Sequence, residues 1–391
     1  MMTAPHDAPT SVQSELDAQR RWCEQVAARA AKYRILSTLP YTKVPFWVSA
    51  THTVNLRRGQ GWASRRGIPE ALFVLKLLRH ANHHDIVLLT GGERRDLVYA
   101  AIAGLCWWIR TPHVIVDAHW QQGTGLKHTL QKWLLRLSGR LVKQVQPHSA
   151  EEVQIYHRIF QLPLSKLAPI PWSTSLIGFD DVSPTDVEEP FVLTGGLSFR
   201  DYGVFLAAAK QSGLRIKIGL PKAGVTQQIQ ALVDQCPNVS LHTAWSNADY
   251  VRQMQLCRVF AMPITQRLTR STADQTLLNA MHYGKVVVST DSIGPRIYIR
   301  DGENGYLVRE ATPQAWARTL KHAFDLSADA YARVERQAWY DARVVFNEPL
   351  RLARTLALAL EVLSPRQPED DRFHFSQQLS ESPVPDVISG R

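Results

Sequence analysis

The sequence predicts an α/β protein of two domains, each with a parallel β-sheet covered by helices. Its 391 residues exceed one ordinary domain and suit two of about 150 to 200 residues. Short apolar runs alternate with helix-length stretches in both halves, as strands and crossover helices do in parallel sheets. The segment 163–190, rich in proline and acidic residues, interrupts this rhythm and indicates an interdomain linker.

The first half opens with a polar leader and helix before its first strand. Short apolar runs closed by Pro40 or by Gly91 and Gly92 are typical of buried strands. The expected elements, in order, are a strand at 33–39, a helix at 68–81, a strand at 85–90, a helix through Ile109, a strand at 113–117, a basic amphipathic stretch at 126–140 and a strand at 141–145.

The second half repeats this rhythm after a strand that runs into Gly195 and Gly196. Residues 313–362 are expected to be mostly helical, and the polar tail 366–391 lacks a periodic apolar pattern and is expected to be disordered. The other elements, in order, are strands at 191–194, 214–218, 239–242, 259–263 and 285–290, with helices at 202–212, 225–235, 247–256 and 273–283 between them.

Composition excludes several protein classes. Hydrophobic residues make up 45% and charged residues 20%, which is ordinary for a globular protein. The four cysteines lack any C-x-x-C pairing, so neither a disulfide framework nor a zinc site is predicted, and a reducing cytosol fits best. The first thirty residues do not resemble a secretory signal. The longest apolar run, 97–109, has 13 residues against the ~20 that span a bilayer, and indicates a buried helix.

The net charge of +10 favours a polyanionic partner: a nucleotide, a nucleic acid or an anionic membrane surface. Nucleic acid is disfavoured because no zinc-finger spacing or RNA-binding aromatic signature is found. The basic stretch 126–140, with Trp107, Trp108 and Trp133 near it in sequence, has two interpretations. It docks on an anionic membrane, or it is an ordinary domain helix with its apolar face in the core.

A polar loop at 271–275 leads into the N-terminus of the helix expected at 273–283. Free backbone N–H groups and the dipole at a helix N-terminus can hold a phosphate, so this is a candidate anion site. The alternative is that Asp274 only caps the helix and Gly284 only terminates it.

Two motifs carry a family resemblance. The run DQTLLNAMHYGKVVVST at 274–290, followed by DGENGYLV at 301–308, resembles the carboxy-terminal domain of family 4 retaining glycosyltransferases of the GT-B fold. The run FVLTGGLSFRDY at 191–202 resembles that family's strand, glycine turn and basic residue that hold the donor diphosphate. Arg200 takes the basic position, and the planar fork of a guanidinium suits a diphosphate. The alternative is a surface arginine beside Asp201.

The resemblance implies two Rossmann-like domains whose parallel sheets face each other across a cleft. The implied organisation is a leader and helix at 1–32, an acceptor-side domain at 33–175, a linker at 176–190, a donor-side domain at 191–345, a C-terminal helix at 346–365 and a disordered tail at 366–391.

The chain departs from the family at two positions. The family carries two glutamates with seven residues between them, one binding the donor sugar and the later one the ribose; here Ser271 and Asn279 stand there. Neither side chain provides a carboxylate, although both can hydrogen-bond hydroxyls. The options are an altered sugar pocket, a substitute acid such as Asp274, or a weakened enzyme, and we favour the first two together.

The predicted site has two parts. His119 ends a strand where the family often carries a histidine facing the donor sugar; the alternative is a structural histidine. Ser149 and Pro171 match structural landmarks of the family, and Asp180 and Asp181 are discounted as a metal motif because they lie in the linker. The predicted catalytic residues are His119, Asp274 and Ser271, and the predicted donor-binding residues are Gly195, Gly196, Ser198, Arg200, Gln275, Thr276 and Asn279.

The resemblance implies retaining transfer of a hexose or related sugar from a UDP- or GDP-sugar to a glycan or lipid-linked acceptor, in bacterial polysaccharide or glycoconjugate synthesis. No cofactor and no metal is expected besides the nucleotide-sugar co-substrate. The expected location is the cytoplasm, with peripheral binding at the inner face of the plasma membrane as an option. Two other functions stay open: a nucleotide-sugar epimerase or hydrolase, and a non-catalytic binding or scaffold subunit.

Overall fold

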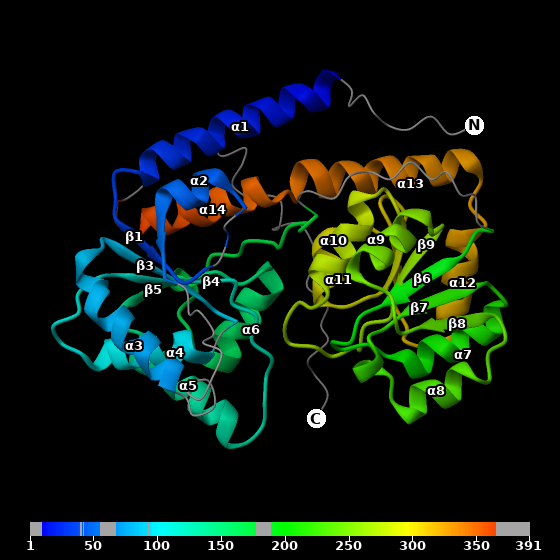
Figure 1. Ribbon diagram of the computed structural model, residues 1–391, viewed down its shortest axis with the longest axis horizontal. Helices are drawn as coiled ribbons and strands as arrows, with labels where there is room; N and C mark the ends of the chain where they lie inside the picture. Colours follow the sequence, from blue (N-terminus) through cyan, green and yellow to red (C-terminus); the bar gives the residue numbers. More distant parts are fainter. Residues whose placement is uncertain are drawn as a thin grey trace. The chain divides into compact units, whose positions relative to one another are not determined.

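The computed structural model describes residues 10–39, 41, 43–54, 68–92, 94–176 and 189–364. The chain forms two compact units (Figure 1). The N-terminal unit comprises Ser14–Pro171 and Pro349–Arg391, and the C-terminal unit comprises Trp172–Glu348 with Met1–Gln13. Each holds one parallel sheet, which confirms the predicted fold class of two parallel-sheet α/β domains.

The sheet of the N-terminal unit has five parallel strands in the order β2-β1-β3-β4-β5. The register pairs Ile35 with Ile86 and Val87 with His113. The strands are β1 (Ile35–Ser37), β2 (Thr51–Thr53), β3 (Ile86–Thr90), β4 (His113–Val116) and β5 (Val142–Val145). The helices are α1 (Thr10–Ala30), α2 (Pro45–Ala50), α3 (Ile68–His80), α4 (Arg94–Leu105), α5 (Leu126–Ser138), α6 (Ala150–Phe160) and α14 (Glu348–Glu361).

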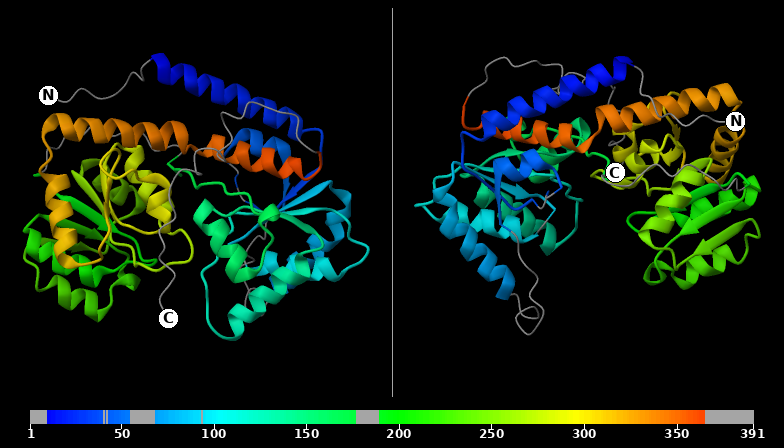
Figure 2. Two further views of the ribbon diagram at one scale, coloured as in Figure 1. Left: turned by 180° about the vertical axis from the view of Figure 1, so that it is seen from behind. Right: turned by 45° about the horizontal axis from the view of Figure 1, so that its top comes forward.

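Helices cover both faces of this sheet (Figures 1 and 2). On one face α1, α2 and α14 enclose a core that includes Trp22, Trp47 and Leu356 together with Leu88 and Val114 of the strands. On the other face lie α3, α4 and α5. The last helix, α14, therefore completes a core whose strands come from the first 150 residues.

The sheet of the C-terminal unit has six parallel strands in the order β11-β10-β9-β6-β7-β8. Its strands are β6 (Val192–Gly195), β7 (Ile216–Gly219), β8 (Val239–His242), β9 (Val259–Met262), β10 (Val286–Thr290) and β11 (Tyr306–Val308). Its helices are α7 (Tyr202–Ser212), α8 (Gln227–Val233), α9 (Asn247–Leu256), α10 (Asp274–His282), α11 (Ile293–Tyr298), α12 (Pro313–Phe324) and α13 (Ala328–Tyr340).

The order of these strands reverses between β6 and β9. From β6 the chain builds outward through β7 and β8, then returns to pair β9 with the other side of β6. Such a reversal opens a crevice at the carboxyl ends of the two central strands, which is where open α/β sheets bind ligands. A binding site is therefore expected at the end of β6.

Several elements coincide with the sequence prediction, and others were missed. The helices expected at 202–212 and 247–256 coincide with α7 and α9. The strands β2 and β11 have three residues each, too few for a periodic pattern. Also missed were α2, α6 and α11. Most of the predicted linker at 176–190 and all of the predicted tail at 366–391 lie outside the described residues.

Candidate active site

A glycine turn ends β6 at the reversal point of the C-terminal unit. A β-carbon at Gly195 would lie 2.5 Å from the hydroxyl oxygen of Tyr250 and 2.7 Å from the carbonyl oxygen of Gly219, so no larger residue fits. Gly196 has a φ of +93°, a region that favours glycine. The turn therefore brings bare backbone to the carboxyl edge of the sheet.

Arg200 folds back over this turn. Its Nε donates to the carbonyl of Gly195 at 3.1 Å and its Nη1 to the carbonyl of Ser198 at 2.8 Å. Its Nη2 lies 3.9 Å from the sulfur of Met262, at the end of β9. The guanidinium thus bridges the ends of the two strands that flank the reversal point.

The charge of Arg200 is not neutralised by the protein. Burial lowers the pKa of its guanidinium, and among the described residues no acidic side chain pairs with it. Asp201, the neighbour that the alternative interpretation invoked, caps α7 by accepting from the backbone N–H of Val204 at 3.0 Å. A half-buried cation hydrogen-bonded only to weak acceptors is suited to bind an anion.

The loop before α10 lies beside the glycine turn, because the guanidinium of Arg270 stacks 5.1 Å from the ring centre of Phe199. Ala273, with a φ of +66°, is the N-cap residue of α10 and makes no side-chain cap. Asp274 is the first residue of the helix, so the alternative that it serves as the N-cap is wrong. Its carboxylate is buried against Gly294, where a β-carbon would lie 2.6 Å from Oδ1. Ser271 is also buried.

Two of the predicted donor-binding side chains are held by the chain itself. Asn279 Oδ1 accepts from the hydroxyl of Thr174 and from the backbone N–H of Ser175, each at 3.1 Å. Its Nδ2 donates to Ser175 Oγ at 3.3 Å, and Nε2 of Gln275 donates to the same oxygen at 2.5 Å. Thr174 and Ser175 were not predicted, although they closely follow the landmark Pro171. Thr276 is half-buried on α10, and Ser198 is exposed in the turn.

An aromatic pair is formed by the last residue of β8 and a tryptophan in the loop after it. The rings of His242 and Trp245 stack in parallel, 4.1 Å apart and 8° from coplanar. A β-carbon at Gly219, the end of β7, would lie 2.9 Å from Trp245 Cε3 and 2.7 Å from Tyr250. The pair therefore lies beside the same edge of the sheet as the glycine turn. Sequence reasoning missed it, although a tryptophan in a polar loop after a strand was the available signal.

In the N-terminal unit, His119 follows β4. Its Nδ1 lies 2.8 Å from the carbonyl oxygen of Asp117. A carbonyl only accepts, so Nδ1 carries a proton. The end of β3 fits against the ring, because a β-carbon at Gly92 would lie 2.5 Å from Cε1 of His119. The ring of His148 stacks beside it with centroids 6.0 Å apart.

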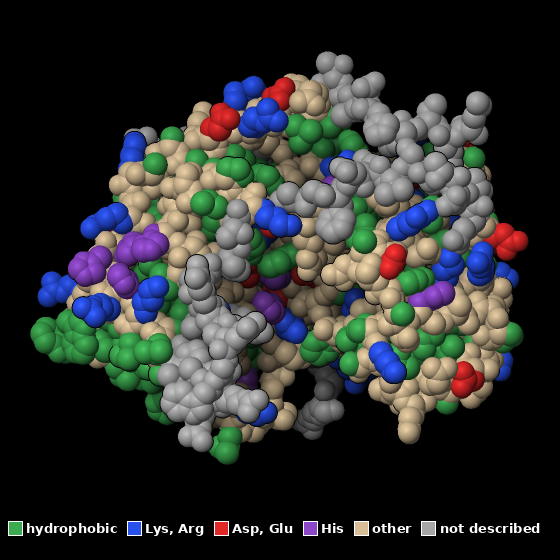
Figure 3. Space-filling model, in the orientation of Figure 1, with side chains coloured by type: hydrophobic (Ala, Val, Ile, Leu, Met, Phe, Trp, Pro, Cys, Tyr) green, Lys and Arg blue, Asp and Glu red, His purple; other side chains and the backbone are tan. Residues whose placement is uncertain are grey.

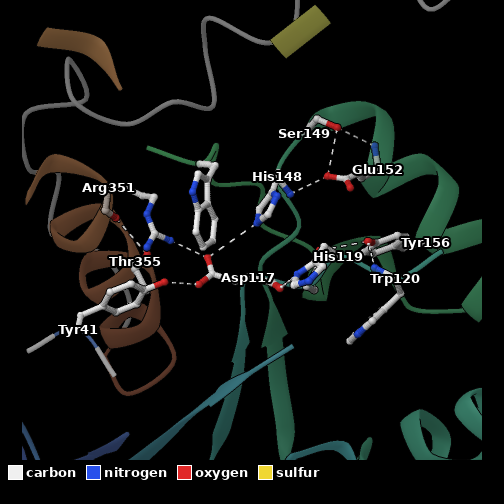
Figure 4. A network of polar contacts seen from close by, with 12 residues as sticks. Tyr41, Asp117, His119, Trp120, His148, Ser149, Glu152, Tyr156, Arg351 and Thr355 are labelled. Carbon is white, nitrogen blue, oxygen red and sulfur yellow. Dashed lines mark hydrogen bonds and ion pairs between the residues drawn. The ribbon is translucent and has the colours of Figure 1, made fainter. Parts of the chain in front are cut away.

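A buried ionic network lies beneath this histidine (Figure 4). The carboxylate of Asp117 accepts from Arg351 Nη1 at 2.6 Å and from the Tyr41 hydroxyl at 2.7 Å, and His148 Nε2 is 3.8 Å away. Burial alone would raise the pKa of Asp117, but Arg351, His148 and Tyr41 together hold it below the ordinary value. Asp117 is thus a charged anchor for α14, and its φ of +54° turns the chain toward His119.

The landmark Ser149 has a structural role. Its Oγ accepts from the backbone N–H of Glu152 at 3.0 Å and caps α6. The Glu152 carboxylate accepts from the N–H of His148 at 2.8 Å, which fixes the residue that stacks on His119. Among the described residues no group of three or more His, Cys, Asp or Glu is arranged to hold a metal ion; Asp180 and Asp181 lie outside them.

Comparison with solved structures identifies the fold. The chain is similar to a glycosyltransferase from Rickettsia africae (TM-score 0.63, 14% identity, covering 88% of this chain and 95% of that one). It is similar to Anabaena HepE in complex with UDP (0.62, 17%, 87% and 96%). It also resembles a sucrose-phosphate synthase from Thermosynechococcus elongatus (0.64, 15%, 89% and 94%). The chain has the GT-B glycosyltransferase fold.

A family model matches part of the C-terminal unit. Residues 203–325 match the family described as Glycosyl transferases group 1, whereas no curated protein sequence matches the chain. The matched stretch lies within the C-terminal unit, which therefore resembles a group 1 glycosyltransferase domain.

Removing one partner of the Asp117–Arg351 pair should destabilise the N-terminal unit strongly. Arg351→Met leaves a buried carboxylate without its cation, which typically costs about 3 to 5 kcal/mol, whereas Arg351→Met combined with Asp117→Asn should cost much less. The measurement is urea unfolding followed by circular dichroism. Equal losses in the single and double variants would contradict the network described here.

The same pair predicts a dependence on pH. The depressed pKa of Asp117 contributes stability above the unfolded-state pKa of about 3.9, and this contribution is lost as pH falls toward the folded-state value. The wild type should therefore lose more unfolding free energy than Asp117→Asn between about pH 5 and pH 2. Parallel pH profiles for the two proteins would show that the carboxylate has no such role.

Proposed function

We propose that the chain is a retaining glycosyltransferase of the family 4 type. It moves a sugar from a UDP- or GDP-sugar to a hydroxyl of a glycan or lipid-linked acceptor in bacterial polysaccharide or glycoconjugate synthesis. The observation that carries this proposal is the half-buried, unneutralised guanidinium of Arg200 at the reversal point of the C-terminal sheet. Fold similarity alone names a class, whereas this cation indicates an anionic substrate.

The donor diphosphate binds at the glycine turn in this proposal. Gly195 and Gly196 let the phosphates approach the backbone, and Arg200 offers its donors at the same edge. The N-terminus of α10, which Phe199 and Arg270 hold beside the turn, adds the positive end of a helix dipole. Both groups stabilise the leaving diphosphate as negative charge develops on it, with no metal required.

The nucleobase stacks on Trp245. The His242–Trp245 pair lies beside the end of β7, next to the strand that bears the glycine turn, and offers a flat aromatic surface. Base–aromatic stacking is typically worth about 1 to 3 kcal/mol. The UDP bound to the structurally similar HepE supports a uridine nucleotide as the first donor to test.

The sugar pocket differs from that of the family. Ser271 stands where the family has its first glutamate, Asp274 follows it three residues later, and we propose that Asp274 supplies the missing carboxylate. We also propose His119 as a catalytic residue, because it follows β4 at the carboxyl edge of the N-terminal sheet.

A second function is favoured by one observation. Asn279, at the family's ribose-binding position, uses both polar atoms of its side chain on Thr174 and Ser175. If a nucleotide does not displace these contacts, the chain binds its donor weakly, as a non-catalytic subunit would. Donor binding without turnover is the result that separates this function from transfer.

Loss of Arg200 should abolish donor binding. In a thermal-shift screen with UDP, GDP and ADP, the nucleotide that stabilises the wild type should give almost no shift with Arg200→Ala and a reduced shift with Arg200→Lys, which keeps the charge without the fork. Arg215→Ala, an exposed arginine of the same unit, is the control. Shifts of wild-type size in Arg200→Ala would place the diphosphate elsewhere.

Loss of Trp245 should weaken nucleosides selectively. Trp245→Ala is expected to lower the affinity for UMP by about 5- to 100-fold and to leave inorganic pyrophosphate binding unchanged, since only the base stacks on the ring. Calorimetric titration of both ligands measures this, with Trp339→Ala on α13 as the control. A matching loss of pyrophosphate binding would point to a collapsed loop rather than to base stacking.

A further inference from the structure

Exposed apolar side chains gather in one region of the N-terminal unit. Of the thirteen large hydrophobic residues that are exposed in the described chain, nine lie between Leu72 and Trp133, on α3, α4, α5 and the turn after α4. Figure 3 shows hydrophobic side chains together with Lys, Arg and His at the edge of the unit where these elements lie. Concentrated exposure of this kind marks an interaction surface, whereas scattered single residues do not.

The turn after α4 presents two tryptophans. Trp107 is 77% exposed and Trp108 is 54% exposed, with their rings edge to face at 6.0 Å. Arg140 holds the turn through four hydrogen bonds to the carbonyls of Ala103, Gly104, Cys106 and Ile109, at 2.7 to 3.2 Å. Asn82 donates to the carbonyl of Trp108 from the other side at 2.8 Å. The hydrogen-bonded backbone of the turn therefore keeps both rings exposed to solvent.

Helix α5 adds an apolar stripe. Leu126, Leu130 and Trp133 follow the spacing of one helix face and are all exposed, whereas Leu135 lies in the core. The interpretation of 126–140 as an ordinary domain helix with its apolar face in the core therefore fits Leu135 but not these three side chains. The ends of α4 and α5 are in close contact, because a β-carbon at Gly104 would lie 2.1 Å from the carbonyl oxygen of Leu137.

The charged side chains of α5 and of the segments next to it in sequence are all basic. Between Asp117 and Glu151 the sequence has no Asp or Glu but five basic residues, three of them on α5: Lys127, Lys132 and Arg136. The guanidinium of Arg136 lies 5.9 Å from the Trp133 ring centre, so cation and aromatic ring share one surface.

We propose that this tryptophan–α5 surface, made of the Trp107–Trp108 turn and the exposed stripe of α5, docks onto an anionic lipid bilayer. Tryptophan rings favour the boundary between headgroups and acyl chains, and lysine and arginine beside them pair with lipid phosphates. The binding is peripheral, since no described helix is long and apolar enough to cross a membrane. It uses residues other than those proposed for the donor, so either proposal can fail alone.

Sedimentation with phosphatidylcholine vesicles, with and without phosphatidylglycerol, tests the proposal at low salt. The wild type should bind only the anionic vesicles and dissociate as salt is added. The Trp107→Ala/Trp108→Ala variant should bind at least about tenfold more weakly. Lys127→Gln, Lys132→Gln and Arg136→Gln should each weaken binding about fivefold. The matched control is Val48→Ala/Leu164→Ala, which removes two exposed apolar side chains elsewhere in the unit and should bind as the wild type does.

The proposal would be overturned if the wild-type protein did not sediment with anionic vesicles. It would also be overturned if the tryptophan variant bound them as strongly as the control. A wild-type mass in solution that halves in the tryptophan variant would assign the surface to a second copy of the chain instead. Unchanged melting temperature and nucleotide-induced shift in the variants would show that folding and the donor site are intact, so weaker sedimentation would then report the membrane contact alone.

Discussion

The parallel pairing of the strands is the constraint on which the rest of the structure depends. Parallel neighbours need a crossover helix between them, so every strand of a unit ends at the same edge of its sheet. Three of the non-glycine residues with positive φ, namely Asp117, Phe199 and Ala273, lie next to His119, Arg200 and Asp274. Local strain of this kind clusters at functional sites, which is why the carboxyl edges hold the chemistry of this chain.

Sequence patterns predicted many of the elements that depend on neighbours along the chain, although α6 was missed. The strand at 239–242 and the helix at 247–256 are local signals, and both were found. The contact of Asn279 with Ser175 joins residues 104 positions apart, and no periodicity reports it. The place of Arg200 beside the glycine turn can be read from the sequence. Its contact with Met262, at the end of another strand, cannot.

Two kinds of polar burial have different consequences in this chain. Asp117 and Arg351 satisfy each other, and their desolvation is offset by short hydrogen bonds and by the Tyr41 hydroxyl. Among the described residues the partners of Arg200 are carbonyl and sulfur atoms, and no ion pair with them offsets its desolvation. The first arrangement fixes the fold, and the second keeps electrostatic free energy available for an anionic ligand.

The return of α14 to the N-terminal unit sets an order of assembly during synthesis. The core of the C-terminal unit comes from residues 192–334, whereas the core around Trp47 needs Leu356 and its neighbours on α14. A ribosome delivers residues in sequence at about 5 to 20 per second, so the first half emerges long before its last core helix. The half that is made first is therefore completed last, after α14 has emerged from the ribosome.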